Sequence, residues 1–259
     1  MNYMQQGHDD WGAIFRDLAA LIDSAPSPPR RSVGRWTRKD QAEAHAIAVA
    51  WGWLIRLKRT AEGVLELEKH GYGNEAAPMS RSVIEHAIRL PWAADKGRQE
   101  FVEILIRMRS WSLQKILEAS EAGWPLTDDQ RDQISDLQDE AGEDFRELDR
   151  FMQLAAVVAD DPEQFAGLYQ VWLAETQESH PSLQSSASYR EQSEDGLTWG
   201  LSSSPRPGTR RYDVLMPSLL WLGLRGYARV ADLADHFEKP LNELGQRMED
   251  LGVGRRQAP

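Results

Sequence analysis

The feature that most constrains the fold is a helical hydrophobic pattern that runs from Thr37 to His70 without a proline. Its apolar stripe recurs at three- and four-residue steps and consists of Ala46, Val49, Trp53, Leu57, Ala61, Val64 and Leu65. A helix of about thirty residues is roughly 45–50 Å long. That length is typical of the spine of a helical bundle, so we predict an all-α protein organised around this helix.

Capping and stop signals divide the rest of the chain into further helices. Thr37, Thr127 and Asp161 have the residue types that cap helix N-termini, and Gly71 is placed to end the spine helix. Asn74 is expected to cap the next helix, and Pro91 to kink or end it. We expect a bundle of seven to eight helices with no credible strand and no internal repeat, over residues 9–22, 37–70, 79–94, 98–122, 127–145, 162–180, 212–237 and 241–251.

The segments rich in proline, glycine and serine between the helical patterns predict one main domain with two appendages. Residues 1–36 hold a first amphipathic helix and a proline-rich connector, residues 37–252 form the bundle domain, and residues 253–259 are a disordered tail. Within the bundle, residues 182–211 are rich in serine and glycine and show no helical or strand period. We interpret them as one long loop, of the kind that is usually functional or disordered.

Composition excludes several classes of chemistry. The chain has no cysteine, which removes disulfides, thiolate nucleophiles, zinc ribbons and iron–sulfur ligation. The sequence has no phosphate-binding GxxxxGK, no GxGxxG, no GxSxG and no HExxH. We expect no cofactor and no metal, and we interpret the one-turn pairs Glu66/His70 and Asp232/His236 as solvated surface pairs. The apolar runs are shorter than a membrane span, and a secretory signal is lacking, so a cytoplasmic location is expected.

The net charge of -11 is unevenly distributed. Residues 118–163 carry fifteen acidic side chains against three arginines, whereas residues 30–59 carry eight basic side chains against two acids. The overall charge argues against a surface that binds nucleic acid everywhere. It leaves room for RNA at a local basic site, and it makes the acidic segment a candidate surface for a protein partner.

The strongest candidate site lies on the apolar helix over residues 79–94. Arg81 and Glu85 are four residues apart and share a helix face, so an ion pair with little solvation is expected. Arg81 and His86 also satisfy the Arg-x4–6-His spacing of HEPN ribonucleases, as do Arg38 with His45 and Arg229 with His236. On a regular helix a five-residue step rotates the side chain by about 140°, so Arg81 and His86 should not converge within one protomer.

Two segments together resemble a known family. The stretch GNEAAPMSRSVIEHAIRLPWAAD and, about a hundred residues later, LYQVWLAETQESHPSLQSSASY are similar to the signature segments of domain-of-unknown-function family 5677, a family of bacterial helical proteins. The matching positions are Arg81, Glu85, Tyr169, His180 and Ser182, and the resemblance covers about residues 45–235. It implies an all-helical fold distantly similar to HEPN and abortive-infection proteins, and no established activity.

The resemblance implies that Arg81, Glu85 and His180 meet. In a catalytic interpretation, Arg81 binds phosphate, His180 or His86 acts as acid or base, and Glu85 orients the imidazole. In the alternative, the same cluster is a satisfied polar network that joins two helices.

The leading hypothesis for function is a HEPN-like bacterial effector, a metal-independent endoribonuclease of the toxin or phage-defence type. The alternative is a non-catalytic helical binding or scaffold protein. A homodimer is expected from the surplus of aromatic residues. Trp199, in the serine-rich segment, is a candidate lid or partner contact.

Overall fold

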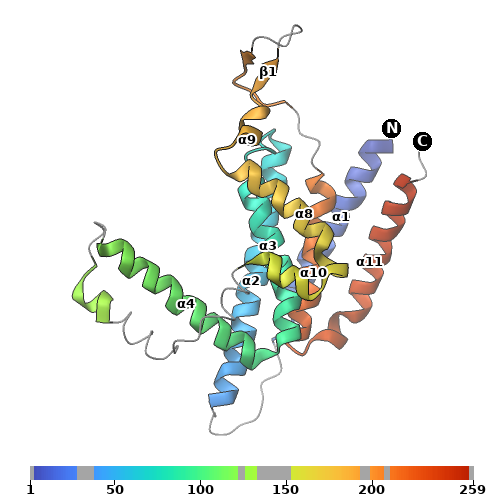
Figure 1. The fold of residues 1–259 in the computed structure, drawn as a ribbon. Helices are drawn as coiled ribbons and strands as arrows, with labels where there is room; N and C mark the ends of the chain where they lie inside the picture. The colour runs from blue at the N-terminus through green and yellow to red at the C-terminus, as the bar shows by residue number, and fades with distance from the viewer. Residues whose placement is uncertain are drawn as a thin grey trace.

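The structure is a computed structural model that describes residues 3–27, 38–121, 126–132, 153–192, 199–206 and 211–256. The fold is all-α, as predicted (Figure 1). The helices are α1 (Tyr3–Asp23), α2 (Arg38–Lys69), α3 (Ala77–Lys96), α4 (Arg98–Glu121), α7 (Leu154–Asp160), α8 (Pro162–Ser179), α9 (Leu183–Ala187), α10 (Tyr212–Val230) and α11 (Ala234–Arg256). Two short strands, β1 (Arg190–Gln192) and β2 (Trp199–Leu201), pair as an antiparallel hairpin.

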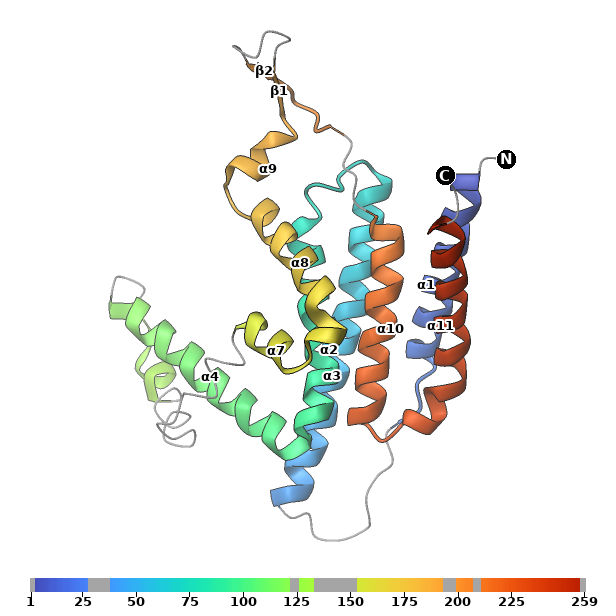
Figure 2. The same cartoon turned by 45° about the vertical axis from the view of Figure 1, so that its right-hand side comes forward.

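Helix α3 lies at the centre of the bundle. Helices α2 and α10 pack against it and against each other, α7 and α8 also contact it, and α1 and α11 pack on α10. Helix α4 touches α2 and α3 and extends away from the bundle (Figures 1 and 2). Because α3 has neighbours on several sides, its polar residues must find partners on those neighbours.

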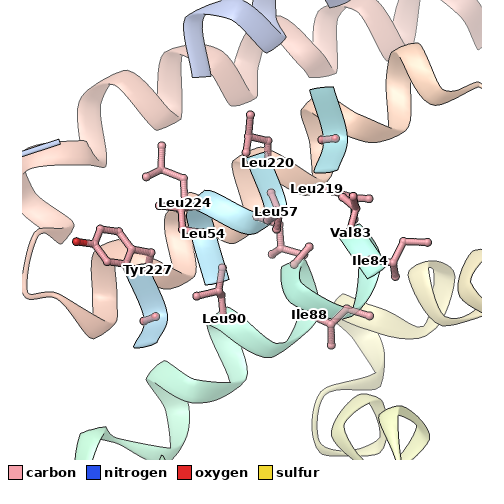
Figure 3. Packing of buried hydrophobic residues seen from close by; sticks show 14 of the residues in the cluster. Leu54, Leu57, Val83, Ile84, Ile88, Leu90, Leu219, Leu220, Leu224 and Tyr227 are labelled. Atoms are coloured by element: carbon pink, nitrogen blue, oxygen red, sulfur yellow. The ribbon is translucent and has the colours of Figure 1, made fainter. Parts of the chain in front are cut away.

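The core is formed where α2, α3 and α10 meet (Figure 3). One pair of apolar side chains from each helix illustrates it: Leu54 and Leu57 from α2, Ile84 and Ile88 from α3, and Leu220 and Leu224 from α10, all with no exposed surface. Burying one such side chain stabilises the folded state by about 1.5–3 kcal/mol. This three-helix core holds α3 in place, and with it the candidate site.

Helices α3 and α10 approach each other at the level of the backbone. A Cβ atom added to Gly226 would lie 2.4 Å from the Pro91 backbone nitrogen and 2.6 Å from the Leu90 carbonyl carbon. Glycine is therefore required at this position. Pro91 does not end its helix, because α3 continues to Lys96.

Several predicted helix ends are confirmed. Gly71 has a φ of 83°, and the amide of Tyr72 donates to the Leu67 carbonyl at 2.8 Å, which is the six-to-one bond of a Schellman motif. The Asp161 side chain accepts from the Gln164 amide at the start of α8. Thr127 caps a short helical segment at residues 128–132, because its hydroxyl oxygen accepts from the Gln130 amide at 3.3 Å.

The predicted cap at Asn74 is wrong. The residue that precedes α3 is Ala76, which has no capping side chain. Asn74 takes part through its backbone instead, since its carbonyl accepts from the Ala77 amide at 3.3 Å.

The C-terminal helices break earlier than predicted. Helix α10 ends at Val230, and Asp232 adopts a φ of 57°. Arg98, at the start of α4, stabilises this end because its Nε donates to the Val230 carbonyl at 2.6 Å and its Nη2 lies 2.6 Å from the Asp232 carboxylate. Helix α11 then passes through Pro240 and continues to Arg256, beyond residue 251, where the sequence pattern placed its end.

The described parts of the serine-rich segment, residues 182–192 and 199–206, contain regular structure that the sequence did not predict. It contains α9, which Ser182 opens with a capping box, and the β1–β2 hairpin. Strands of three residues are too short for a two-residue period to be visible in the sequence. The Tyr189 hydroxyl donates to Glu75 and so ties the hairpin to the turn before α3.

Other predictions fall outside the described residues. These are the proline-rich connector from residue 28, the predicted cap at Thr37, most of the acidic segment at 118–163, and residues 257–259 of the predicted tail. Among the described helices, none combines the length and the apolar character needed to cross a bilayer.

Candidate functional site

The candidate site is a cavity of about 640 Å³ beside the polar face of α3. Five helices contribute to its wall. The lining residues are Trp53 from α2, Arg81, Glu85, His86 and Arg89 from α3, Met108 from α4, Leu154 and Ala155 from α7 with the preceding Gln153, and Tyr169 and Trp172 from α8. The cavity thus gathers the polar residues that the sequence singled out on α3.

Glu85 is the centre of the polar cluster. Its Oε1 accepts from Arg81 Nε at 3.2 Å and from the Trp172 indole nitrogen at 2.9 Å. Its Oε2 accepts from Arg89 Nη1 at 3.1 Å. These two ion pairs follow from sequence spacing, because Arg81, Glu85 and Arg89 lie at intervals of four residues along the same face of α3.

Charge and hydrogen bonding decide the ionisation of Glu85. Burial raises the pKa of this carboxyl, whereas the Trp172 hydrogen bond and the charges of Arg89 and Arg81 lower it, and the net result is a pKa below the ordinary value. Glu85 is therefore an anion at neutral pH. Two guanidinium groups oppose one carboxylate, which leaves the cluster with an excess of positive charge.

Arg81 connects α3 to the C-terminal end of α8. Its Nη1 lies 3.4 Å from His180 Nε2, across 99 residues of sequence. Because a guanidinium can only donate, His180 Nε2 is the acceptor in this contact. The Arg81 guanidinium also lies over the Trp172 ring, 5.1 Å from the ring centroid.

His86 is held by the backbone of its own helix. Its Nδ1 donates to the Ser82 carbonyl at 2.7 Å, which leaves Nε2 as the acceptor in the neutral ring. Burial lowers the pKa of His86, and the nearby charges of Arg56 and Arg89 lower it further, although the Ser82 hydrogen bond and Glu85 act in the opposite direction. The ring is therefore a neutral imidazole at physiological pH.

The structure brings Arg81, Glu85 and His180 together, as the resemblance implied. The expected contact between Glu85 and an imidazole is replaced by a different arrangement, in which Arg81 bridges Glu85 and His180. The reason is geometric: both Glu85 oxygens already accept from Arg81, Arg89 and Trp172. His86 lines the same cavity one turn away from Arg81 and bonds to Ser82.

The two remaining residues of the resemblance have separate places. Tyr169 stacks on Trp172 with ring centroids 5.6 Å apart and an angle of 13° between the rings. Ser182 lies just after α8, where its hydroxyl donates to the Gln177 carbonyl at 2.7 Å and caps α9. The side chain of Trp199, the candidate lid residue, is outside the described residues.

Sequence reasoning missed several residues of the cavity wall, among them Arg89, Trp53 and Trp172. Arg89 could have been found, because the Arg-x3-Glu-x3-Arg spacing continues the Arg81–Glu85 pair by one more turn. Trp53 belongs to the apolar stripe predicted for the spine helix, and Trp172 lies in the helix predicted for residues 162–180. No sequence signal separates a tryptophan in a core from one in a cavity wall.

Glu66 and His70 pair at the C-terminal end of α2. His70 Nδ1 lies 3.4 Å from a Glu66 carboxylate oxygen, and both side chains are exposed. Within the part of the chain that the structure describes, no group of three or more His, Asp or Glu side chains is arranged to hold a metal ion. Comparisons of the chain with known protein families, curated proteins and solved structures gave no match.

Proposed function

We propose that this chain is a HEPN-like bacterial effector of the toxin or phage-defence type that cleaves RNA at the α3–α8 cavity without a resident metal. The observation that carries the proposal is the 3.4 Å contact between Arg81 Nη1 and His180 Nε2. It joins Arg81, a phosphate-binding group that lines the cavity, to a proton acceptor at the end of α8. The proposal includes a HEPN-like core of seven to eight helices, a cytoplasmic location and a homodimer.

The chemistry would be general acid–base catalysis. When Arg81 turns from His180 Nε2 to the substrate phosphate, that nitrogen would accept the proton of a ribose 2′-hydroxyl, and the oxygen would form a bond to phosphorus while the bond to the 5′ oxygen breaks. The departing 5′ oxygen takes up a proton from the imidazolium or from water, and a 2′,3′-cyclic phosphate remains. Arg81 would stabilise the negative charge that develops on phosphorus oxygens. His86, a second neutral imidazole on the cavity wall, is the alternative proton acceptor.

Arg81 has donors for this role. Its contacts to Glu85 and His180 use Nε and Nη1, and a guanidinium carries five N–H donors in total. Glu85 would serve as a positioning residue, because it holds the two arginines and Trp172 in one arrangement.

The test is cleavage of a 5′-labelled single-stranded RNA by the full chain in the presence of EDTA. We expect products ending in a 2′,3′-cyclic phosphate, and a loss of about 100-fold or more in rate for Arg81→Met and for His180→Gln. Matched controls are Arg225→Met, an exposed arginine of α10, and His70→Gln, an exposed histidine at the end of α2. Absence of cleavage by the wild type, or equal rates for the site and control variants, would reject the proposal.

A second candidate function is a non-catalytic binding or scaffold protein. The observation that favours it is the saturation of Glu85, whose two oxygens accept from α3 twice and from α8 once. Such a cluster joins two helices whether or not a substrate binds. It predicts that Arg81→Met lowers the melting temperature, and that neither the wild type nor any variant cleaves RNA.

A further inference from the structure

The cavity extends well beyond the polar cluster. Its volume of about 640 Å³ lies within the range of about 300–1,000 Å³ found for small-molecule sites. Its wall includes the apolar side chains of Trp53, Met108, Leu154 and Ala155, with the polar Gln153 next to the last two in sequence. A phosphate group alone would leave this apolar part empty, so the shape favours a ligand with an anionic end and an apolar body.

Flat groups form one side of the cavity. The Tyr169 and Trp172 rings are nearly parallel, and the Arg81 guanidinium lies over the Trp172 ring. Aromatic rings and arginine planes are the surfaces on which proteins stack unpaired bases. The stack begins at Arg81, which is the residue placed to bind phosphate.

The charges around the cavity also favour an anionic ligand. Arg81 and Arg89 line it, and Arg56 is close enough to lower the pKa of His86. Glu85 is the acidic residue among those that line the wall. Three positive groups against one carboxylate give a local excess of positive charge, in a chain whose net charge is -11.

We propose that the apolar part of the cavity is a subsite for one unpaired nucleobase, with the adjoining phosphate on Arg81. The inference rests on the proposed function and names its substrate class as single-stranded RNA. A base within a duplex is stacked on both faces and cannot enter a cavity between helices without leaving the helix. Cleavage would then occur beside the base that the cavity holds.

The test is a calorimetric binding measurement on the full chain with three probes. These are a nucleoside 3′-monophosphate, ribose 5-phosphate and inorganic phosphate. Ala155, which lines the cavity and is exposed on α7, is replaced by tryptophan to occupy the apolar part of the cavity. Ala159→Trp is the matched control, because Ala159 is exposed on the same helix and is not among the lining residues. Tyr169→Leu is a second variant, which removes a ring while keeping an apolar side chain.

In the wild type, the nucleotide should bind about ten-fold or more tightly than ribose 5-phosphate. Ala155→Trp and Tyr169→Leu should remove this advantage, and Ala159→Trp should keep it. Equal affinity of the nucleotide and the two base-free probes for the wild type overturns the subsite. So does an unchanged nucleotide preference in Ala155→Trp.

A separate measurement distinguishes the subsite from the proposed function. If the nucleotide binds with the expected preference but RNA is not cleaved, the nuclease proposal fails and the subsite remains as a nucleotide-binding site. If single-stranded RNA is cleaved while the preference is absent, the nuclease proposal stands and the base subsite is wrong. Equal cleavage of double-stranded and single-stranded RNA would also contradict the subsite.

Discussion

The guanidinium of Arg81 lies 3.4 Å from the imidazole of His180, although the two residues are separated by 99 positions in the chain. Arg81 is on the central helix α3, and His180 is the residue that ends α8. Each reaches the contact because α8 packs against α3, and because α8 stops where its last turn passes Arg81. The site therefore depends on the position of a helix end as much as on the residues themselves.

The stability of the protein should depend on the ionisation of Glu85. The pKa of Glu85 is lower in the folded protein than its ordinary value, so its contribution is fully present above the unfolded pKa and is lost as pH falls through the folded pKa. The free energy of unfolding of the wild type should therefore fall as pH decreases from about 5 to about 3. In Glu85→Gln this part of the decrease should be absent. Urea unfolding at several pH values measures it, with Glu62→Gln, an exposed residue of α2, as control.

Trp172→Phe should separate the contribution of the indole hydrogen bond to stability from the contribution of the aromatic ring. The substitution keeps an aromatic ring beside Tyr169 and Arg81 and removes the N–H that donates to Glu85 at 2.9 Å. A hydrogen bond to a charged group contributes about 1.5–3 kcal/mol, and the partial exposure of the site reduces this figure, so we expect a loss of about 1–2 kcal/mol. Chemical denaturation at neutral pH measures it, and a change of less than about 0.3 kcal/mol would contradict the assigned hydrogen bond.

Gly226→Ala should be strongly destabilising. Its new Cβ would lie 2.4 Å from the Pro91 backbone nitrogen, so α3 and α10 would have to separate. We expect a loss of about 2–4 kcal/mol, since neither backbone can move without disturbing the core. Gly52→Ala is the matched control, because nothing lies within 4 Å of its Cβ position and it is in the interior of α2. That variant should be neutral or more stable by about 0.5–1 kcal/mol.

Arg98→Ala should loosen the junction between α10 and α11. It removes the hydrogen bond to the Val230 carbonyl and the ion pair with Asp232, which has a φ of 57°. We expect a loss of about 1.5–3 kcal/mol, from a hydrogen bond made by a charged group at a helix end. Hydrogen exchange should show faster exchange of the amides at residues 230–234. If exchange there is unchanged, Arg98 does not stabilise the break.

Local signals in the sequence predicted those parts of the fold that depend on nearby residues. The spine helix, the stop at Gly71 and the caps at Thr127 and Asp161 each depend on residues within one turn, and each is confirmed. The ion pair of Arg81 with Glu85 is a four-residue relationship on one helix and is also confirmed.

Features that depend on distant residues were not predictable in the same way. The break at Asp232 is stabilised by Arg98, which belongs to another helix, and apolar periodicity continues through the break to Phe237. The indole N–H of Trp172 donates to Glu85 Oε1, and Arg81 contacts both Glu85 and His180. Nothing in the sequence spacing specifies Trp172 as a hydrogen-bond partner of Glu85.

The order of the helices along the chain has a consequence during synthesis. Helix α10 covers the inner faces of α2 and α3, yet it is made after both of them and after α8. Until residues 212–230 have left the ribosome, Leu57 and Leu90, which lie against Gly223 of α10, lack the partner helix that covers them. The nascent chain must therefore carry an uncovered apolar surface for most of its synthesis, and it is in this interval that chaperones would have to protect it from aggregation.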